Sequence, residues 1–275
     1  MDELIQKVID QVKNEMNDAA SKQTAAPVVT ESKACADDKN SEIFKDVGVT
    51  EYVGSAMGPT IGLVLASIDA GLAERLELGR YRSIGFIGSR AGFNPQAFAV
   101  DEAVKATNVE VLKVEAPRDD MGGDGASSYF VIGADDVSDV RRCVEIALTN
   151  VEKYYGGIWA NDFGHLDMQW TARASYCLAK AFGAEVGKAF GVINAGPTPI
   201  GAVLSDTAVK AANVEIVDYT SCTSGSGFSY ANEFTMTITG DSGAVRQAVK
   251  ATIEPGRRIL SGFGGEAECM GVPYY

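Results

Sequence analysis

The sequence has 275 residues, of which 24 are basic and 37 acidic, giving a net charge of −13. Such an acidic chain repels nucleic-acid phosphates and anionic membrane surfaces, so we expect neither as a partner. No apolar run approaches the roughly 20 residues that a membrane-spanning helix needs. The length is enough for two domains of roughly 100 residues each.

Residues 1–17 place apolar side chains at helical spacing, which predicts a short amphipathic helix. Residues 18–47 are mostly small, polar and non-periodic, which predicts a flexible linker. A tethered amphipathic helix is most simply a docking peptide that binds a groove of a partner. The alternative is a helix that folds back onto its own domain.

The first predicted domain spans 48–157 and has the element order β-α-β-α-β-β-α. Asp69 is expected to cap its first helix, and Asn94-Pro95 to supply the N-cap and the N1 proline of its second. The predicted elements are a strand at 60–68, a helix at 71–78, a strand at 82–88, a helix from Asn94, strands at 109–114 and 129–132, and a helix at 135–154.

The second predicted domain spans 158–266 and repeats this order, with a tail at 267–275. Its predicted elements are a strand at 166–170, a helix at 172–182 closed by Gly183, a strand at 189–193, a helix capped by Thr198-Pro199, strands at 214–219 and 234–238, and a helix at 241–253. Each domain is therefore expected to be a two-layer α/β (α+β) sandwich, ferredoxin-like, on a four-stranded antiparallel sheet.

An internal repeat supports this division. Residues 101–110 (DEAVKATNVE) and 206–215 (DTAVKAANVE) are identical at eight of ten positions, at an offset of 105. The strands before them match at an offset of 106, whereas the loops that follow, 118–125 and 221–228, differ sharply. A repeat of this length indicates duplication of a whole domain, with the scaffold retained and the loops changed.

The sequence offers little that could carry chemistry. The single histidine, His165, is most simply a hydrogen-bonded structural residue, because no partner order for a catalytic triad or zinc site surrounds it. No Walker lysine follows a glycine loop. Asp119, Asp120 and Asp124 could hold a cation but lack the glutamate of a calcium loop. We therefore predict no catalytic residue, no metal, no cofactor and no enzymatic activity.

The repeated segment also resembles a known family, the bacterial microcompartment (BMC) shell domain. The matching segments are Ile84–Gly88, Asp101–Glu110, 118–128 and Asp135–Arg141 in the first copy, and Phe190–Ile193, Asp206–Glu215, Ser221–Ser229 and Gly240–Arg246 in the second. An extra strand and helix precede the family's usual first strand in each copy, at 60–78 and 164–183. This order is similar to the circularly permuted tandem group of PduB, EtuB and EutL, and the N-terminal extension resembles that of its diol-utilisation members.

The resemblance implies a homotrimer in which six domain positions form a pseudohexameric ring that tiles shell facets edge to edge with other shell proteins. It places Lys105 and Lys210 at the tile edge, near Asn108 and Asn213. A solvated helix lysine is the alternative interpretation. It also implies a location in the microcompartment shell, within the cytoplasm, and residues 1–17 would then connect the shell to encapsulated enzymes.

The family passes small molecules through its rings, here polyols such as 1,2-propanediol or glycerol, or aldehydes. The candidate pore-lining residues are Asp119, Asp120, Gly122, Gly123, Asp124, Ser224, Gly225, Ser226, Gly227 and Ser229. Arg90, Asn94 and Asn194 are candidates for an inter-domain cleft.

The five cysteines, Cys35, Cys143, Cys177, Cys222 and Cys269, contain no C-x-x-C pair and predict free thiols in a reducing compartment. Three copies of Cys222 around a threefold axis could ligate an iron–sulfur cluster, although an unligated thiol is simpler. The competing function from another class is a small-molecule sensor built of two ferredoxin-like domains.

Overall fold

The computed structural model describes residues 50–119, 125–221 and 232–275, all within one compact unit, Asp37–Tyr275. The predicted N-terminal helix and linker lie outside the described residues. Below, the first half means residues 50–157 and the second half residues 158–275.

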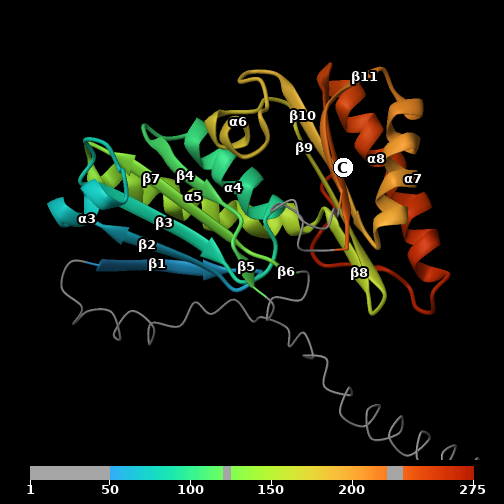
Figure 1. The fold of residues 1–275 in the computed structure, drawn as a ribbon, viewed down its shortest axis with the longest axis horizontal. Helices are drawn as coiled ribbons and strands as arrows, with labels where there is room; N and C mark the ends of the chain where they lie inside the picture. The colour runs from blue at the N-terminus through green and yellow to red at the C-terminus, as the bar shows by residue number, and fades with distance from the viewer. Residues whose placement is uncertain (1–49, 120–124, 222–231) are drawn as a thin grey trace, which may run out of the picture. The chain divides into compact units, whose positions relative to one another are not determined.

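The first half is built on an antiparallel sheet with the strand order β1-β2-β3-β7-β4. Helices α4 and α5 lie on one face of this sheet (Figure 1). Its elements are β1 (Thr50–Ala56), β2 (Thr60–Leu65), α3 (Ala70–Arg75), β3 (Ser83–Ser89), α4 (Asn94–Lys105), β4 (Glu110–Glu115), the short hairpin β5 (Arg118–Asp119) and β6 (Gly125–Ala126), β7 (Ser128–Ala134) and α5 (Val137–Tyr155).

The second half is built on a sheet with the order β11-β12-β10-β9-β8-β13. Helices α7 and α8 pack side by side against it (Figure 1). Its elements are β8 (Ile158–Asn161), β9 (Gly164–Thr171), α6 (Tyr176–Phe182), β10 (Ala189–Gly196), α7 (Thr198–Ala211), β11 (Val214–Ser221), β12 (Phe234–Gly240), α8 (Ser242–Ser261) and β13 (Glu268–Cys269).

The predicted two-layer fold is confirmed, but the number of strands is corrected. The sheets have five and six strands instead of four, because β1 and β8 extend them and β13 adds an edge. Strand β1 escaped prediction because it contains Gly54, which disfavours a strand. A Cβ added at Gly54 would lie 3.3 Å from the Leu148 side chain of α5, so this glycine allows the helix to pack closely.

Two helix boundaries also differ from prediction. Helix α6 begins at Tyr176 instead of Ala172, because Ser175 is its N-cap and a carboxylate from the first half binds there, as described below. Helix α8 continues through Pro255 to Ser261, although an interior proline typically costs about 3 kcal/mol. Buried Gly256 and Leu260 hold this extension against the second core.

The predicted caps divide into two groups. Asp69 is the N-cap of α3, as predicted, and Gly183 ends α6 in a left-handed conformation with φ of 71°. Asp136, expected inside the helix at 135–154, is the N-cap of α5, and both carboxylates accept backbone N–H groups. Asn94 and Thr198 are instead the first residues of their helices and follow the N-caps, Phe93 and Pro197.

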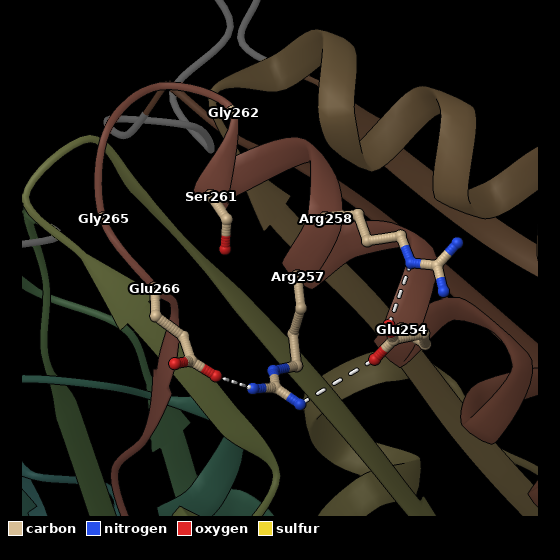
Figure 2. Close-up of a pocket in the computed structure, with 7 residues that line it drawn as sticks. All are labelled: Glu254, Arg257, Arg258, Ser261, Gly262, Gly265 and Glu266. Carbon is tan, nitrogen blue, oxygen red and sulfur yellow. Dashed lines mark hydrogen bonds and ion pairs between the residues drawn. The ribbon is translucent and has the colours of Figure 1, made fainter.

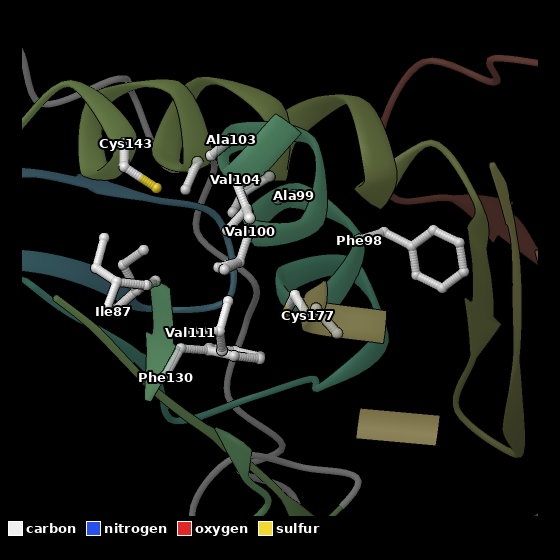
Figure 3. Packing of buried hydrophobic residues seen from close by; sticks show 14 of the residues in the cluster. Ile87, Phe98, Ala99, Val100, Ala103, Val104, Val111, Phe130, Cys143 and Cys177 are labelled. Carbon is white, nitrogen blue, oxygen red and sulfur yellow. The ribbon is translucent and has the colours of Figure 1, made fainter. Parts of the chain in front are cut away.

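The main hydrophobic core crosses from one half to the other. Figure 3 shows Phe98 of α4 and Phe130 of β7 in this core, together with Cys177 of α6. The rings of Phe98 and Phe190 of β10 stack with centroids 6.3 Å apart. Because burial of a large apolar side chain contributes roughly 1.5–3 kcal/mol, the shared core binds the halves together. None of the described helices combines the length and apolar character needed to cross a membrane.

Candidate functional site

The two halves meet where α4 and β4 pack against α6 and where α4 packs against β9, a contact that we call the inner joint. At its centre the buried carboxylate of Asp101 accepts hydrogen bonds from the backbone N–H groups of Ser175 and Leu178, both at 3.0 Å. Burial raises the pKa of Asp101, while these N–H groups and Lys105 act in the opposite direction. The first half therefore supplies the anion that satisfies the start of α6.

Lys105, a predicted edge residue, contributes to the inner joint. Its Nζ lies 2.8 Å from Glu102 Oε1 and donates to the backbone oxygen of Arg173 at 2.8 Å. Its side chain is 21% exposed, whereas that of Lys210, its repeat counterpart, is 73% exposed and pairs with Asp206. The two copies of this lysine therefore have different surroundings. Asn108 and Asn213 lie in exposed turns that follow α4 and α7.

A buried polar network crosses the inner joint beside this cluster. Asn94 Nδ2 donates to Asp167 Oδ2 at 2.8 Å, and Gln169 Nε2 donates to Asp167 Oδ1 at 2.6 Å. The Tyr274 hydroxyl donates to Gln169 Oε1 at 2.7 Å. Burial raises the pKa of Asp167 to about 7, despite the hydrogen bonds from Gln169 and Asn94.

Two of the three predicted cleft residues lie beside Asp167. Asn194 is buried and stands opposite Asp167 in the β10–β9 register, so Asn94 and Asn194 are brought together. Arg90 is exposed in the turn after β3. Asn194 Nδ2 donates to Glu233 Oε2 at 3.2 Å, and His165 Nε2 lies 3.3 Å from the same oxygen. His165 is therefore a hydrogen-bonded structural residue, as predicted.

Sequence reasoning missed four members of these networks: Asp167, Gln169, Glu233 and Tyr274. Asp167 and Gln169 did carry a signal, because polar residues interrupt the otherwise apolar strand β9. Buried polar groups in such positions need partners. Nothing local indicates that Tyr274 or Glu233 supplies one.

Most of the predicted pore-lining residues cannot be placed. Asp119 ends β5, which pairs with β6 and forms the neck of a hairpin. Strands β11 and β12 form the corresponding hairpin in the second half. The other predicted pore-lining residues, together with Cys222, lie outside the described part of the chain: Asp120, Gly122, Gly123, Asp124, Cys222, Ser224, Gly225, Ser226, Gly227 and Ser229.

The described residues contain no cluster of three side chains suited to a metal ion. Cys143, Cys177 and Cys269 are free thiols, and burial raises the pKa of Cys143 to about 12. A surface pocket near the end of α8 is lined by Arg257 and Arg258 (Figure 2). Arg257 pairs with Glu266 at 2.7 Å and Arg258 with Glu254 at 2.9 Å, so these acids neutralise the pocket.

Several apolar residues that are buried at the inner joint have repeat counterparts that are exposed. Phe98 is 0% exposed, but its counterpart on α7, Val203, is 54% exposed. Val111 of β4 is 3% exposed, and its counterpart on β11, Ile216, is 57% exposed.

On the opposite side of the joint, Leu178 of α6 is 0% exposed and its counterpart Leu72 of α3 is 48% exposed. Both sides of the inner joint thus recur as apolar surfaces that are exposed in the described part of the chain.

Comparison with known proteins decides the family. A family model for the BMC domain matches residues 83–161 and 189–263, one segment in each copy of the repeat. The chain belongs to the family of bacterial microcompartment shell proteins. The bacterial microcompartment shell protein PduB of Citrobacter freundii is 46% identical over 260 residues, which cover 92% of this chain and 96% of that protein.

Solved structures agree. The crystal structure of EtuB from Clostridium kluyveri has a TM-score of 0.77 and 47% identity, covering 82% of this chain and 98% of that chain. A crystal structure described as a trimeric bacterial microcompartment shell protein PduB has a TM-score of 0.77 and 42% identity, covering 82% and 99%. These relatives confirm the predicted tandem shell fold and indicate a structural shell protein.

Proposed function

We propose that this chain is a homotrimeric tile of a microcompartment shell, in which an outer joint between chains repeats the inner joint. The observation that carries the proposal is the matched exposure of Val203 and Ile216 on one side of the chain and of Leu72 on the other. The repeat counterparts of these residues pack together at the inner joint within the chain. We therefore expect the two exposed apolar surfaces to pack together between chains. Apolar surface of this sort is favourable to bury.

A contact between two different surfaces is heterologous, and it closes into a ring when the rotation per step allows. Each chain supplies two domain copies, so three chains give a ring of six equivalent positions. The relative described as a trimeric PduB supports this number of subunits. Such rings would tile edge to edge with other shell proteins, with exposed Lys210 and Asn213 as edge candidates.

The tiling is tested by electron microscopy of the purified full chain at increasing protein concentration. We expect flat hexagonal arrays. A matched pair of variants, Lys210→Ala and Lys250→Ala, separates a role of Lys210 in assembly from a general loss of surface charge, because Lys250 is an exposed lysine of α8. Loss of arrays from intact trimers would place Lys210 at the tile edge, whereas loss of the trimer would place it at the outer joint. Particles that never form sheets at any concentration would contradict the proposed tile.

We further propose that small polyols, such as 1,2-propanediol or glycerol, or their aldehydes, pass through the tile. The support is compositional: the segments 120–124 and 222–231 are rich in glycine, serine and aspartate. Glycine permits close approach of backbones near an axis. Hydroxyl and peptide groups can form hydrogen bonds with a polyol. Asn94 and Asn194 at the inner joint are the second candidate route.

Passage is tested in assembled shells that enclose a diol-consuming enzyme. Replacing Ser224, Ser226 and Ser229 with valine should slow diol entry, while the same change at Ser138, an exposed residue at the start of α5, should not. Equal entry rates in both variants would exclude the 222–231 segment as a route.

Residues 1–17 are proposed to dock encapsulated enzymes through their predicted amphipathic helix. Deletion of residues 1–40 should leave the oligomer intact and release cargo from purified shells. Retention of the full cargo complement would contradict this role.

A further inference from the structure

Resting on the proposed trimer, we infer that the outer joint is held by an ion triad of Asp69 from one chain with Lys210 and Asp206 from the next. This triad takes the place of the buried Asp101 carboxylate that caps α6 at the inner joint. The two joints would then share a geometry but differ in chemistry: one is a buried carboxylate on backbone N–H groups, the other a partly exposed and salt-sensitive charge cluster.

The correspondence follows from strand register and repeat. Gly85 pairs with Val64, and its counterpart Gly191 pairs with Trp170, so β2 and β9 align at an offset of 106. The same offset makes Asp69, the N-cap of α3, the counterpart of Ser175, the N-cap of α6.

On the other side of the joint, α4 and α7 align at an offset of 105. Asp206 and Lys210 are therefore the counterparts of Asp101 and Lys105.

The inner joint depends on a vacant backbone donor that the outer joint lacks. At the inner joint, the Leu178 N–H is bound by Asp101 from the other half at 3.0 Å. Its counterpart, the Leu72 N–H, is already bound by the carboxylate of Asp69 at 2.9 Å. When Asp206 of the next chain approaches α3, it therefore meets the Asp69 carboxylate. At the inner joint, Asp101 meets the unbound N–H group of Leu178 instead.

A cation is available at this position. Lys105 sits beside Asp101 and reaches across the inner joint to the backbone oxygen of Arg173. Lys210 has lost two side-chain partners that Lys105 has at the inner joint, because Thr207 and Leu65 replace Glu102 and Thr171. Within one chain it contacts Asp206 at 2.5 Å and is otherwise largely exposed. The carboxylate of Asp69 supplies the missing acceptor, and Lys210 in turn separates two acids that would otherwise repel.

The chemistry has a measurable consequence for assembly. Exposed ion pairs are screened by salt, with a Debye length of about 10 Å at 0.1 M, whereas the buried cap of the inner joint is not. The chains should therefore separate as the ionic strength rises while each chain stays folded. This difference would let tiles exchange chains without unfolding them.

The test uses the full chain with Lys210→Glu, Asp69→Asn, the double variant and the control Lys250→Glu. Asn keeps the capping acceptor of α3 while removing its charge. Sedimentation measures trimer dissociation between 50 and 500 mM salt, and thermal unfolding checks that each variant is folded.

Like charges brought together cost several kcal/mol, so Lys210→Glu should weaken association about tenfold or more at low salt. Asp69→Asn in the Lys210→Glu background should recover part of this loss, because it removes one repelling acid.

The outcomes separate the two proposals. Recovery in the double variant, with no effect of Lys250→Glu, supports the triad. If Lys210→Glu behaves like Lys250→Glu, or if its effect simply adds to that of Asp69→Asn, the triad is wrong although the trimer stands. If the wild-type chain is monomeric at every salt and protein concentration, it is the proposed trimer that fails.

Discussion

The Nδ2 of Asn94 donates a hydrogen bond to Oδ2 of Asp167 at 2.8 Å, across the boundary between the two halves. The repeat replaces these two residues together: the counterpart of Asn94 is Pro199, and the counterpart of Asp167 is Ile61. A polar pair has become an apolar pair, and both members are exposed on the single chain. Paired replacement is what two surfaces in contact require, because a lone buried carboxylate beside proline would be costly.

Asp167→Asn should change how stability depends on pH. Burial raises the pKa of Asp167 to about 7, above the value near 3.9 expected in the unfolded chain. The folded state therefore holds the proton more tightly, and the free energy of unfolding falls as pH rises from about 4 to 7. The variant should lose much of this fall, as measured by denaturant unfolding at pH 5 and pH 8.

Because the pKa of Asp101 is also raised, the stability of the Asp167→Asn variant should still fall somewhat as the pH rises. A pH profile identical to that of the wild type would show that Asp167 does not titrate in this range.

Asp101→Asn should weaken the inner joint. It removes the charged acceptor of the Ser175 and Leu178 N–H groups, and hydrogen bonds to charged groups contribute about 1.5–3 kcal/mol. The control is Asp135→Asn, whose ion pair with Arg80 is exposed and should contribute little to stability. Denaturant unfolding measures the loss of stability in both variants. Equal losses would show that Asp101 contributes no more to stability than an exposed ion pair does.

Gly256→Ala should destabilise the second half. A Cβ at this position would lie 2.8 Å from the Leu166 side chain and 2.9 Å from that of Leu204, and overpacking of a core typically costs about 1–3 kcal/mol. Gly243→Ala, in the first turn of the same helix, has no atom within 4 Å of the added Cβ and should be neutral or stabilising. Calorimetry should show a lower Tm for the first variant only.

Tyr274→Phe removes a hydroxyl from the polar network without changing the size of the ring. Gln169 Oε1 and the Trp170 N–H both lose their bond to it, and unsatisfied buried groups cost about 1–3 kcal/mol. Tyr176→Phe on exposed α6 is the matched control and should have little effect. A Tyr274→Phe chain as stable as the control would show that water replaces the hydroxyl.

The sequence predicted the elements that depend on local rules. Asp69, Asp136 and Gly183 mark helix ends because each acts on backbone groups within a few residues, and the repeat set the order of the strands. The inner joint was not predictable in the same way. Asp101 binds α6 more than seventy residues away, and no local pattern announces such a partner.

The cleft role of Asn94 and Asn194 stays a prediction. Asn94 begins α4 and Asn194 lies within β10, and no local pattern indicates that both stand beside Asp167 of β9. The surroundings of Lys105 and Lys210 could not be distinguished, since the repeat is nearly identical around them and only tertiary packing covers one of the two.

The mass of the intact full-length chain in solution tests the central claim most directly. Native mass spectrometry at low ionic strength should show a species of three 29.0 kDa chains, about 87 kDa. Replacing Val203 or Leu72 with aspartate should reduce it to single chains, because each lies on one side of the outer joint. A wild-type chain that stays at 29.0 kDa at all concentrations would contradict the account.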